Sequence, residues 1–182
     1  ASKLKVPTHQ LKLGHLPTPI HRWNIPIEQQ SADQKVQFYI KRDDYSGSEM
    51  SGNKVRKLEF LLADALRKNC DSVITVGGIQ SNHCRATAVA CARVGLKAHL
   101  VLRTSNSTTQ DPGYCGNLLV SRLVDATLHL VSTEDYMNHP QGGWGIVQDL
   151  QKKLESSLSS ASQSSSCKPY PVPSGGSCSL GV

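Results

Sequence analysis

The chain has 182 residues, of which 38% are hydrophobic, and carries a formal net charge of +6. This length suits one α/β domain or part of two. The basic residues are scattered and form no stripe interleaved with aromatic side chains, so we expect no nucleic-acid partner. No apolar run is long enough to cross a membrane, and no signal peptide is visible. We therefore expect no membrane partner and a cytoplasmic or mitochondrial protein.

The cysteines indicate reduced thiols and predict no metal site. There is no Cys-x-x-Cys pair and no pair of histidines with zinc-ligand spacing. Small buried thiols are unremarkable inside an alanine-rich helix, where two of the cysteines fall. The six are Cys70, Cys84, Cys91, Cys115, Cys167 and Cys178.

The first 50 residues predict little regular structure. Residues 1–35 contain four prolines and no helical period, so we expect an extended segment laid over a domain. Residues 36–41 are rich in β-formers and predict a short strand. A polar turn over 42–47 then leads to a helix.

That helix is predicted from Ser51 to about Asn69, with Ser51 or Asn53 as its N-cap. Its apolar residues share one face at about 100° per residue, and Lys54 falls on the same face in the first turn. An inward position at the positive end of a helix dipole disfavours an ammonium ion, which makes the neutral amine a usable nucleophile. The alternative is a lysine at the rim whose amine reaches solvent. The apolar face consists of Val55, Leu58, Leu61, Leu62, Ala65 and Leu66.

The middle of the chain alternates between strand and helix patterns. This order predicts an α/β fold with an open parallel sheet and crossover helices. The expected strands are 73–76, 96–103 and 127–131. The expected helices are 81–94, stopped by Gly95, then 112–124, and one that ends over 148–154.

The last part of the chain departs from this alternation. Residues 156–166 are mostly serine and predict a flexible linker or surface insertion. Residues 168–173 predict an extended run that leads into a glycine turn over 174–177. A parallel sheet would normally continue into a helix there, so the sequence reads as cut short.

A second candidate site lies where the strand over 73–76 meets the next helix. Gly77 and Gly78 let the backbone approach a ligand, and ligands of open α/β sheets bind at such strand ends. The amides near Ser81, Asn82 and His83 could hold a carboxylate or a phosphate. The alternative is a simple turn in which Ser81 caps the helix and His83 is exposed. A nucleotide-binding domain would need a phosphate loop, and this stretch is neither a P-loop nor a Gly-x-Gly-x-x-Gly fingerprint.

Three stretches together carry a resemblance to a known family. They are Lys41-Arg42-Asp43-Asp44, Ser51-Gly52-Asn53-Lys54-Val55-Arg56-Lys57-Leu58-Glu59 and Gly77-Gly78-Ile79-Gln80-Ser81-Asn82-His83. The chain resembles the pyridoxal-phosphate enzymes that comprise D-cysteine desulfhydrases and 1-aminocyclopropane-1-carboxylate deaminases, with the desulfhydrases closest. The match extends through residues 16–20 and 116–119 to 175–177. It implies the N-terminal part of a two-domain, tryptophan-synthase-β-like fold.

The resemblance also implies a domain plan and site residues. Residues 1–56 would open the large domain, 57–155 would form a small α/β domain, 156–166 a linker, and 167–182 an incomplete return to the large domain. Pyridoxal 5'-phosphate would form a Schiff base with Lys54, beside Asn53, and Asn82 would contact its ring oxygen. The substrate carboxylate would bind Ser81, Asn82 and His83, and Lys54 and Ser81 would be the catalytic residues.

The implied reaction is β-elimination from D-cysteine, a small-molecule amino-acid substrate, which gives pyruvate, hydrogen sulfide and ammonia. Ring opening of 1-aminocyclopropane-1-carboxylate is the alternative activity. Family members are longer and are expected to form homodimers when complete. Their phosphate-holding loop lies beyond this chain's end, and Cys178 stands where the family usually has Asn. A non-catalytic remnant of the fold that acts as a binding module is therefore a further alternative.

Overall fold

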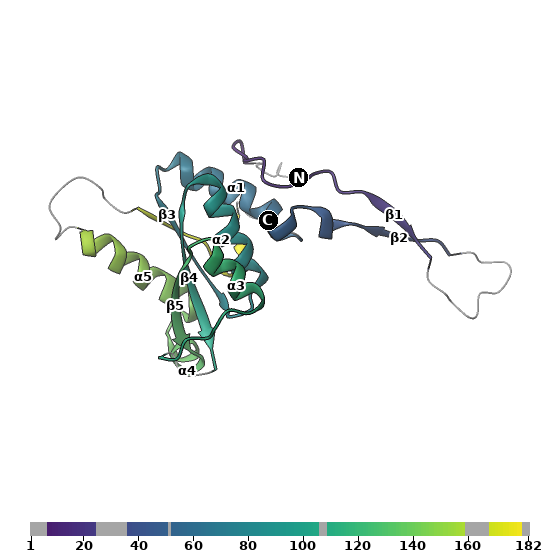
Figure 1. Ribbon diagram of the computed structural model, residues 1–182. Helices are drawn as coiled ribbons and strands as arrows, with labels where there is room; N and C mark the ends of the chain where they lie inside the picture. The colour runs from purple at the N-terminus through teal and green to yellow at the C-terminus, as the bar shows by residue number, and fades with distance from the viewer. Residues whose placement is uncertain (1–6, 25–35, 51, 106–108, 159–167, 180–182) are drawn as a thin grey trace.

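A four-stranded parallel sheet forms the centre of the molecule (Figure 1). The structure is a computed structural model that describes residues 7–24, 36–50, 52–105, 109–158 and 168–179. The strands run in the order β5-β4-β3-β6, so the chain begins the sheet in its interior and adds strands on both sides. Their bounds are β3 Ser72–Gly78, β4 Lys97–Thr104, β5 Thr127–Ser132 and β6 Pro169–Pro171.

Helices cover both faces of this sheet (Figure 1). Helix α2 (Asn82–Val94) lies on β3 and β4 and is flanked by α1 (Lys54–Arg67) and α3 (Gly116–Leu123). The other face carries α4 (Thr133–Asn138) and α5 (Gly142–Leu158). The predicted open parallel sheet with crossover helices is confirmed.

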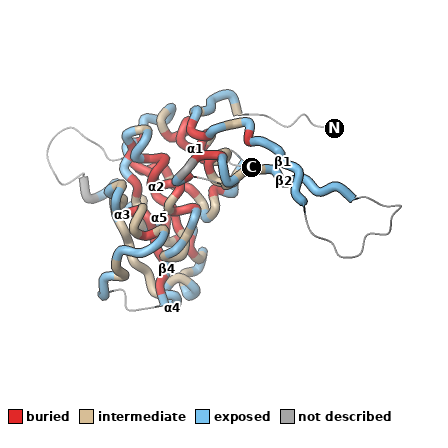
Figure 2. The backbone as a smooth tube through the Cα atoms, turned by 45° about the vertical axis from the view of Figure 1, so that its right-hand side comes forward, coloured by how far each residue is buried: buried red, intermediate tan, exposed pale blue. Residues whose placement is uncertain are grey.

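The main core lies between the sheet and the layer of α1, α2 and α3 (Figure 2). Full burial of a large aliphatic side chain stabilises a fold by about 1.5–3 kcal/mol. The predicted apolar face of α1 is therefore what fixes the orientation of the helix. A smaller core on the opposite face consists of Ile74, Val76, Val101 and Val147. The buried residues of the α1 face are Val55, Leu58, Leu61, Leu62 and Ala65.

The N-terminal part of the chain forms a strap and a hairpin. Strands β1 (Ile20–Trp23) and β2 (Phe38–Lys41) pair antiparallel, and every residue of both is exposed. The hairpin extends away from the sheet (Figures 1 and 2). The strap before it is anchored by the buried Glu59, whose carboxylate accepts hydrogen bonds from the amides of Leu13 at 3.0 Å and Gly14 at 2.9 Å.

Several element boundaries differ from the sequence-based expectations. Strand β1 lies in a segment for which no strand was predicted, and α3 begins at residue 116 and not at 112. Helix α4 was not predicted. Helix α5 begins at Gly142 and continues to Leu158, three residues into the expected linker, and residues 159–166 lie outside the described part.

The glycines at the start of α5 explain why that start was missed. Glycine has a low helix propensity, so the stretch 142–145 reads as a loop. In the structure, a Cβ atom on Gly143 would lie 2.5 Å from the Tyr136 hydroxyl oxygen, and one on Gly145 would overlap the His139 ring. Close packing against α4 and the turn after it therefore requires the glycines that hide the helix.

Candidate active site

Lys54 is the first residue of α1, and its side chain is half-buried. Its Nζ donates a hydrogen bond to Asn53 Oδ1 at 3.1 Å. Asn53 occupies the N-cap position but has helical backbone angles and makes no capping hydrogen bond. The predicted capping role of Asn53 is therefore wrong, because its amide oxygen is directed to the lysine amine. Ser51, the other predicted cap, lies outside the described residues.

The connection between β3 and α2 is a capped turn, as the alternative interpretation of this stretch predicted. Ser81 is the N-cap of α2, and its Oγ accepts a hydrogen bond from the Cys84 amide at 3.2 Å. The amides of Asn82 and His83 lie in the first turn, where a helix offers them no acceptor. Such amides, with the dipole of α2 behind them, form a site suited to an anion.

Gly77 is required at the end of β3 because the cap packs against it. A Cβ atom there would lie 2.6 Å from Ser81 Oγ and 2.7 Å from Cys84 Sγ. The next glycine differs, since a Cβ atom on Gly78 would meet nothing within 4 Å. The turn is thus closely packed at Gly77 and open at Gly78.

His83 is buried, with 5% of its surface exposed, and so the alternative of an exposed side chain is wrong. Its Nε2 lies 2.9 Å from Thr75 Oγ1, and that hydroxyl donates to the Val172 carbonyl at 3.0 Å. One hydroxyl proton cannot serve both contacts, so His83 Nε2 is the donor and Nδ1 carries the lone pair. Among the described residues, Nδ1 has no hydrogen-bond partner.

Burial, together with the nearby charges of Lys54 and Lys57, lowers the pKa of His83 to about 4. The imidazole is therefore neutral near physiological pH. A neutral ring offers no charge to a carboxylate, so an anion at this position would depend on the backbone amides of α2.

The glycine turn near the C-terminus closes against the same residues. Lys57 Nζ donates to Ser177 Oγ at 3.1 Å, next to the short helix η3 (Ser174–Gly176). A Cβ atom on Gly176 would lie 3.6 Å from His83 Cε1. Residues from α1, α2 and η3 thus meet around His83. Sequence reasoning gave Thr75 and Lys57 no role, although a threonine inside an apolar strand was a visible signal for the first.

Asn117, at the start of α3, ties that helix to the β3–α2 connection. Its amide donates to Gln80 Oε1 at 2.8 Å, and its side-chain Nδ2 donates to the Gln80 carbonyl at 2.7 Å. The same Nδ2 lies 3.0 Å from Asn82 Oδ1 and donates to it. Because the oxygen of Asn82 is occupied, its own Nδ2 is the group left to donate to a ligand. Residue 117 had been noted only as part of the resemblance.

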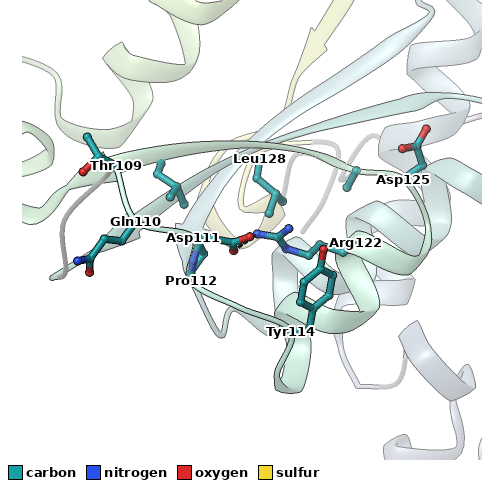
Figure 3. A pocket seen from close by; sticks show the side chains of 10 residues that line it. Thr109, Gln110, Asp111, Pro112, Tyr114, Arg122, Asp125 and Leu128 are labelled. Carbon is teal, nitrogen blue, oxygen red and sulfur yellow. Dashed lines mark hydrogen bonds and ion pairs between the residues drawn. The ribbon is translucent and has the colours of Figure 1, made fainter.

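A separate pocket of about 610 Å³ lies between α3, β5 and the loop over 109–114 (Figure 3). In it, the Arg122 guanidinium lies 4.7 Å from the Tyr114 ring centre and pairs with Asp111 at 2.5 Å. None of the predicted site residues lines this pocket. The volume therefore does not mark the site built from α1 and α2.

Comparisons with known proteins identify the family of the chain. The family model described as "Pyridoxal-phosphate dependent enzyme" matches residues 11–173. The bifunctional D-cysteine desulfhydrase/1-aminocyclopropane-1-carboxylate deaminase, mitochondrial, of Arabidopsis thaliana is 51% identical over 100% of this chain and 42% of its own length. D-cysteine desulfhydrase of Serratia proteamaculans is 41% identical over 80% of this chain and 40% of its own.

A solved structure gives the same result for the fold. The crystal structure of an ACC deaminase homologue superposes with a TM-score of 0.68 and 32% identity, covering 97% of this chain and 47% of that one. The chain spans about half the length of the curated relatives it matches. With the family model matched over most of its residues, the chain belongs to the pyridoxal-phosphate dependent enzyme family.

Proposed function

We propose that the protein is a pyridoxal-phosphate-dependent lyase that eliminates hydrosulfide from D-cysteine, with ring opening of 1-aminocyclopropane-1-carboxylate as the alternative activity. The observation that carries this proposal is the meeting of an amine and an anion site. Lys54 opens α1, the free amides of Asn82 and His83 open α2, and the charge of Lys54 acts on the buried His83. Both activities are named in the Arabidopsis relative.

The residues present fit the cofactor. Lys54 Nζ would hold it covalently, with Asn53 Oδ1 3.1 Å away to orient the amine. Asn82 Nδ2 would donate to its ring oxygen, since the Asn82 oxygen is already occupied by Asn117. The open space beside Gly78 leaves room for a ligand in this place. When bound, pyridoxal phosphate supplies an electron sink for the carbanion formed at the substrate's Cα.

The protein's own groups would then bind and orient the substrate. The amides of Asn82 and His83, with the Ser81 hydroxyl, would hold the carboxylate and turn the Cα–H bond towards Lys54. Lys54 Nζ, once free of the cofactor, would accept the Cα proton as general base. The Cβ–S bond then breaks and hydrosulfide leaves. Release and hydrolysis of the remaining three-carbon unit give pyruvate and ammonia.

The wider organisation follows the same proposal. Residues 1–56 and 167–182 would belong to a large domain and 57–155 to a small one, with a boundary at residue 56 that falls inside α1. We expect the complete protein to form a homodimer and not to bind nucleic acid. The described part contains no helix long and apolar enough to span a membrane. A cytoplasmic or mitochondrial location is proposed, and the mitochondrial name of the Arabidopsis relative supports the second.

The test compares the two substrates on the full-length protein loaded with pyridoxal phosphate. Sulfide release from D-cysteine and ammonia release from 1-aminocyclopropane-1-carboxylate are measured for the wild type, Lys54→Ala and Lys57→Ala. We expect sulfide release to dominate. Loss of a positioned general base should lower it at least about a hundredfold in Lys54→Ala. Lys57→Ala, which loses the contact to Ser177, should retain far more activity.

Two results would count against the proposal. Dominant ammonia release from 1-aminocyclopropane-1-carboxylate would replace the desulfhydrase activity by its alternative. Absence of both products would leave a non-catalytic member of the family, which is the binding-module interpretation.

A further inference from the structure

Two histidines meet across β4 and β5, on the sheet face that α5 covers. The register pairs His99 with Thr127 and Val101 with His129, so the two histidines are diagonal neighbours on one face. His99 Nδ1 and His129 Nε2 lie 3.2 Å apart, and the ring centres are 5.4 Å apart. Both side chains are half-buried, so their edges still reach solvent.

The surroundings disfavour protonation of both rings. Burial, together with His99 and Lys153, lowers the pKa of His129 to about 4. Burial and Lys97 lower the pKa of His99, while Asp71 acts in the opposite direction.

We propose that His99 and His129 together bind a divalent late transition-metal ion, of the Ni²⁺, Cu²⁺ and Zn²⁺ class that prefers imidazole. With metal–nitrogen bonds of about 2.0–2.1 Å, two ligand nitrogens lie about 2.9 Å apart at a right angle and about 3.3 Å apart in a tetrahedron. The observed separation of 3.2 Å falls between these values. In the part of the chain that the structure describes, no group of three or more His, Cys, Asp or Glu side chains forms a metal site, so water completes the coordination.

Binding rearranges one proton and forms two bonds. The proton that now lies between the rings moves to an outer ring nitrogen, so that His99 Nδ1 and His129 Nε2 both present lone pairs to the ion. Each ring stays neutral, and no proton is released. The small number of protein ligands and the positive charge of the nearby Lys153 limit the affinity.

This site is independent of the proposed lyase activity. His99 is the third residue of β4, towards the amino end of the strand, whereas Ser81 and its neighbours follow the carboxyl end of β3. The parallel register of β3 and β4 places these two ends on opposite edges of the sheet. Metal binding can therefore be measured without substrate or cofactor.

The test is calorimetric titration of the full-length protein with Ni²⁺, in a Cys115→Ser background because Cys115 is an exposed thiol. We expect a single ion per chain. His99→Asn and His129→Asn should each weaken binding by more than about tenfold, the lower end of what the loss of even an outer-shell partner costs. His139→Asn is the matched control, since it removes a half-buried histidine that pairs with Asp149 on α5, and its affinity should equal that of the wild type.

A second measurement tests the proposal on the wild-type protein, in case a histidine variant fails to fold. Electron paramagnetic resonance of the protein with one equivalent of Cu²⁺ should show two coordinated nitrogens. Equal Ni²⁺ affinity in the wild type and both histidine variants, loss of binding in His139→Asn, or a Cu²⁺ spectrum without two nitrogens would each overturn it.

Discussion

Two strand-to-helix connections leave the sheet at the same edge, and they are built differently. The β3–α2 connection has three residues, 79–81, and the β4–α3 connection has eleven, 105–115. The short one ends in Ser81, whose side chain caps α2, whereas Cys115 at the start of α3 makes no capping hydrogen bond. The long connection forms one wall of the pocket in Figure 3.

The comparison shows that volume and preorganisation are separate properties. The pocket beside the long connection offers space, but two of its three charged lining residues, Asp111 and Arg122, are already paired with each other. The short connection offers oriented amides and a hydroxyl. Fixed donors that need little reorganisation are what an anionic ligand requires. The predictions below test whether the short connection is indeed the constrained one.

The largest effect is expected from Gly77→Ala, with Gly78→Ala as its matched control. A Cβ atom at residue 77 would overlap Ser81 and Cys84, whereas one at residue 78 meets nothing within 4 Å. Overpacking of this kind costs about 1–3 kcal/mol, and more when the backbone must move. Urea unfolding should show this loss for Gly77→Ala only. Equal stability of the two variants would show that the turn adapts and is not constrained.

The second prediction concerns pH and His83. The folded pKa of about 4 lies below the ordinary value, so the unfolded state binds a proton that the folded state does not. The stabilisation is full above the ordinary pKa and is lost as the pH falls towards the folded pKa. Between about pH 7 and pH 5 this amounts to about 2 kcal/mol of unfolding free energy. His83→Gln should flatten that slope by this amount, and an unchanged slope would contradict the buried, neutral ring.

Ser81→Ala separates capping from substrate binding. Loss of the bond from the Cys84 amide should cost about 1 kcal/mol of stability. If Ser81 also holds the substrate carboxylate, turnover should fall much more than cofactor content, which absorbance of the loaded protein measures. A variant with unchanged kinetics would reduce Ser81 to a helix cap.

The smallest effect is expected at the link between the two connections. Asn117→Ala removes the side-chain hydrogen bonds to the Gln80 carbonyl and to Asn82 Oδ1. These bonds are exposed, so the loss of stability should be about 1 kcal/mol. The Asn82 side chain would lose its orientation, and cofactor affinity should fall more than stability does. Equal affinity in variant and wild type would show that Asn82 is oriented without Asn117.

The sequence predicted well those features that depend on a regular spacing of apolar residues or on a local capping signal. The apolar face of α1, the strands from β3 to β5 and the Ser81 and Gly95 ends of α2 were all readable, because each depends on local chemistry. The start of α5 was missed because it contains glycines, which the close packing against Tyr136 and His139 requires. Strand β1 was missed because it is defined by its pairing with β2, which follows it at a distance in the sequence. Both depend on contacts that are distant in sequence or specific to packing.

The candidate site shows the same limit. Lys54, Ser81 and Asn82 were identifiable from motif and position, but the burial of His83 was not. Its environment is built by Thr75, by the Val172 carbonyl 97 residues from Thr75 along the chain, and by Gly176. No local pattern encodes such a contact.

The most direct test of the central claim is the identity of the lysine that binds pyridoxal phosphate. The full-length protein is loaded with the cofactor, reduced with borohydride to trap the covalent bond, digested and mapped by mass spectrometry. The placement of Lys54 at the start of α1, beside Asn53 and near the amides of α2, predicts the label on Lys54. A label on Lys57 or Lys41 instead would contradict the account.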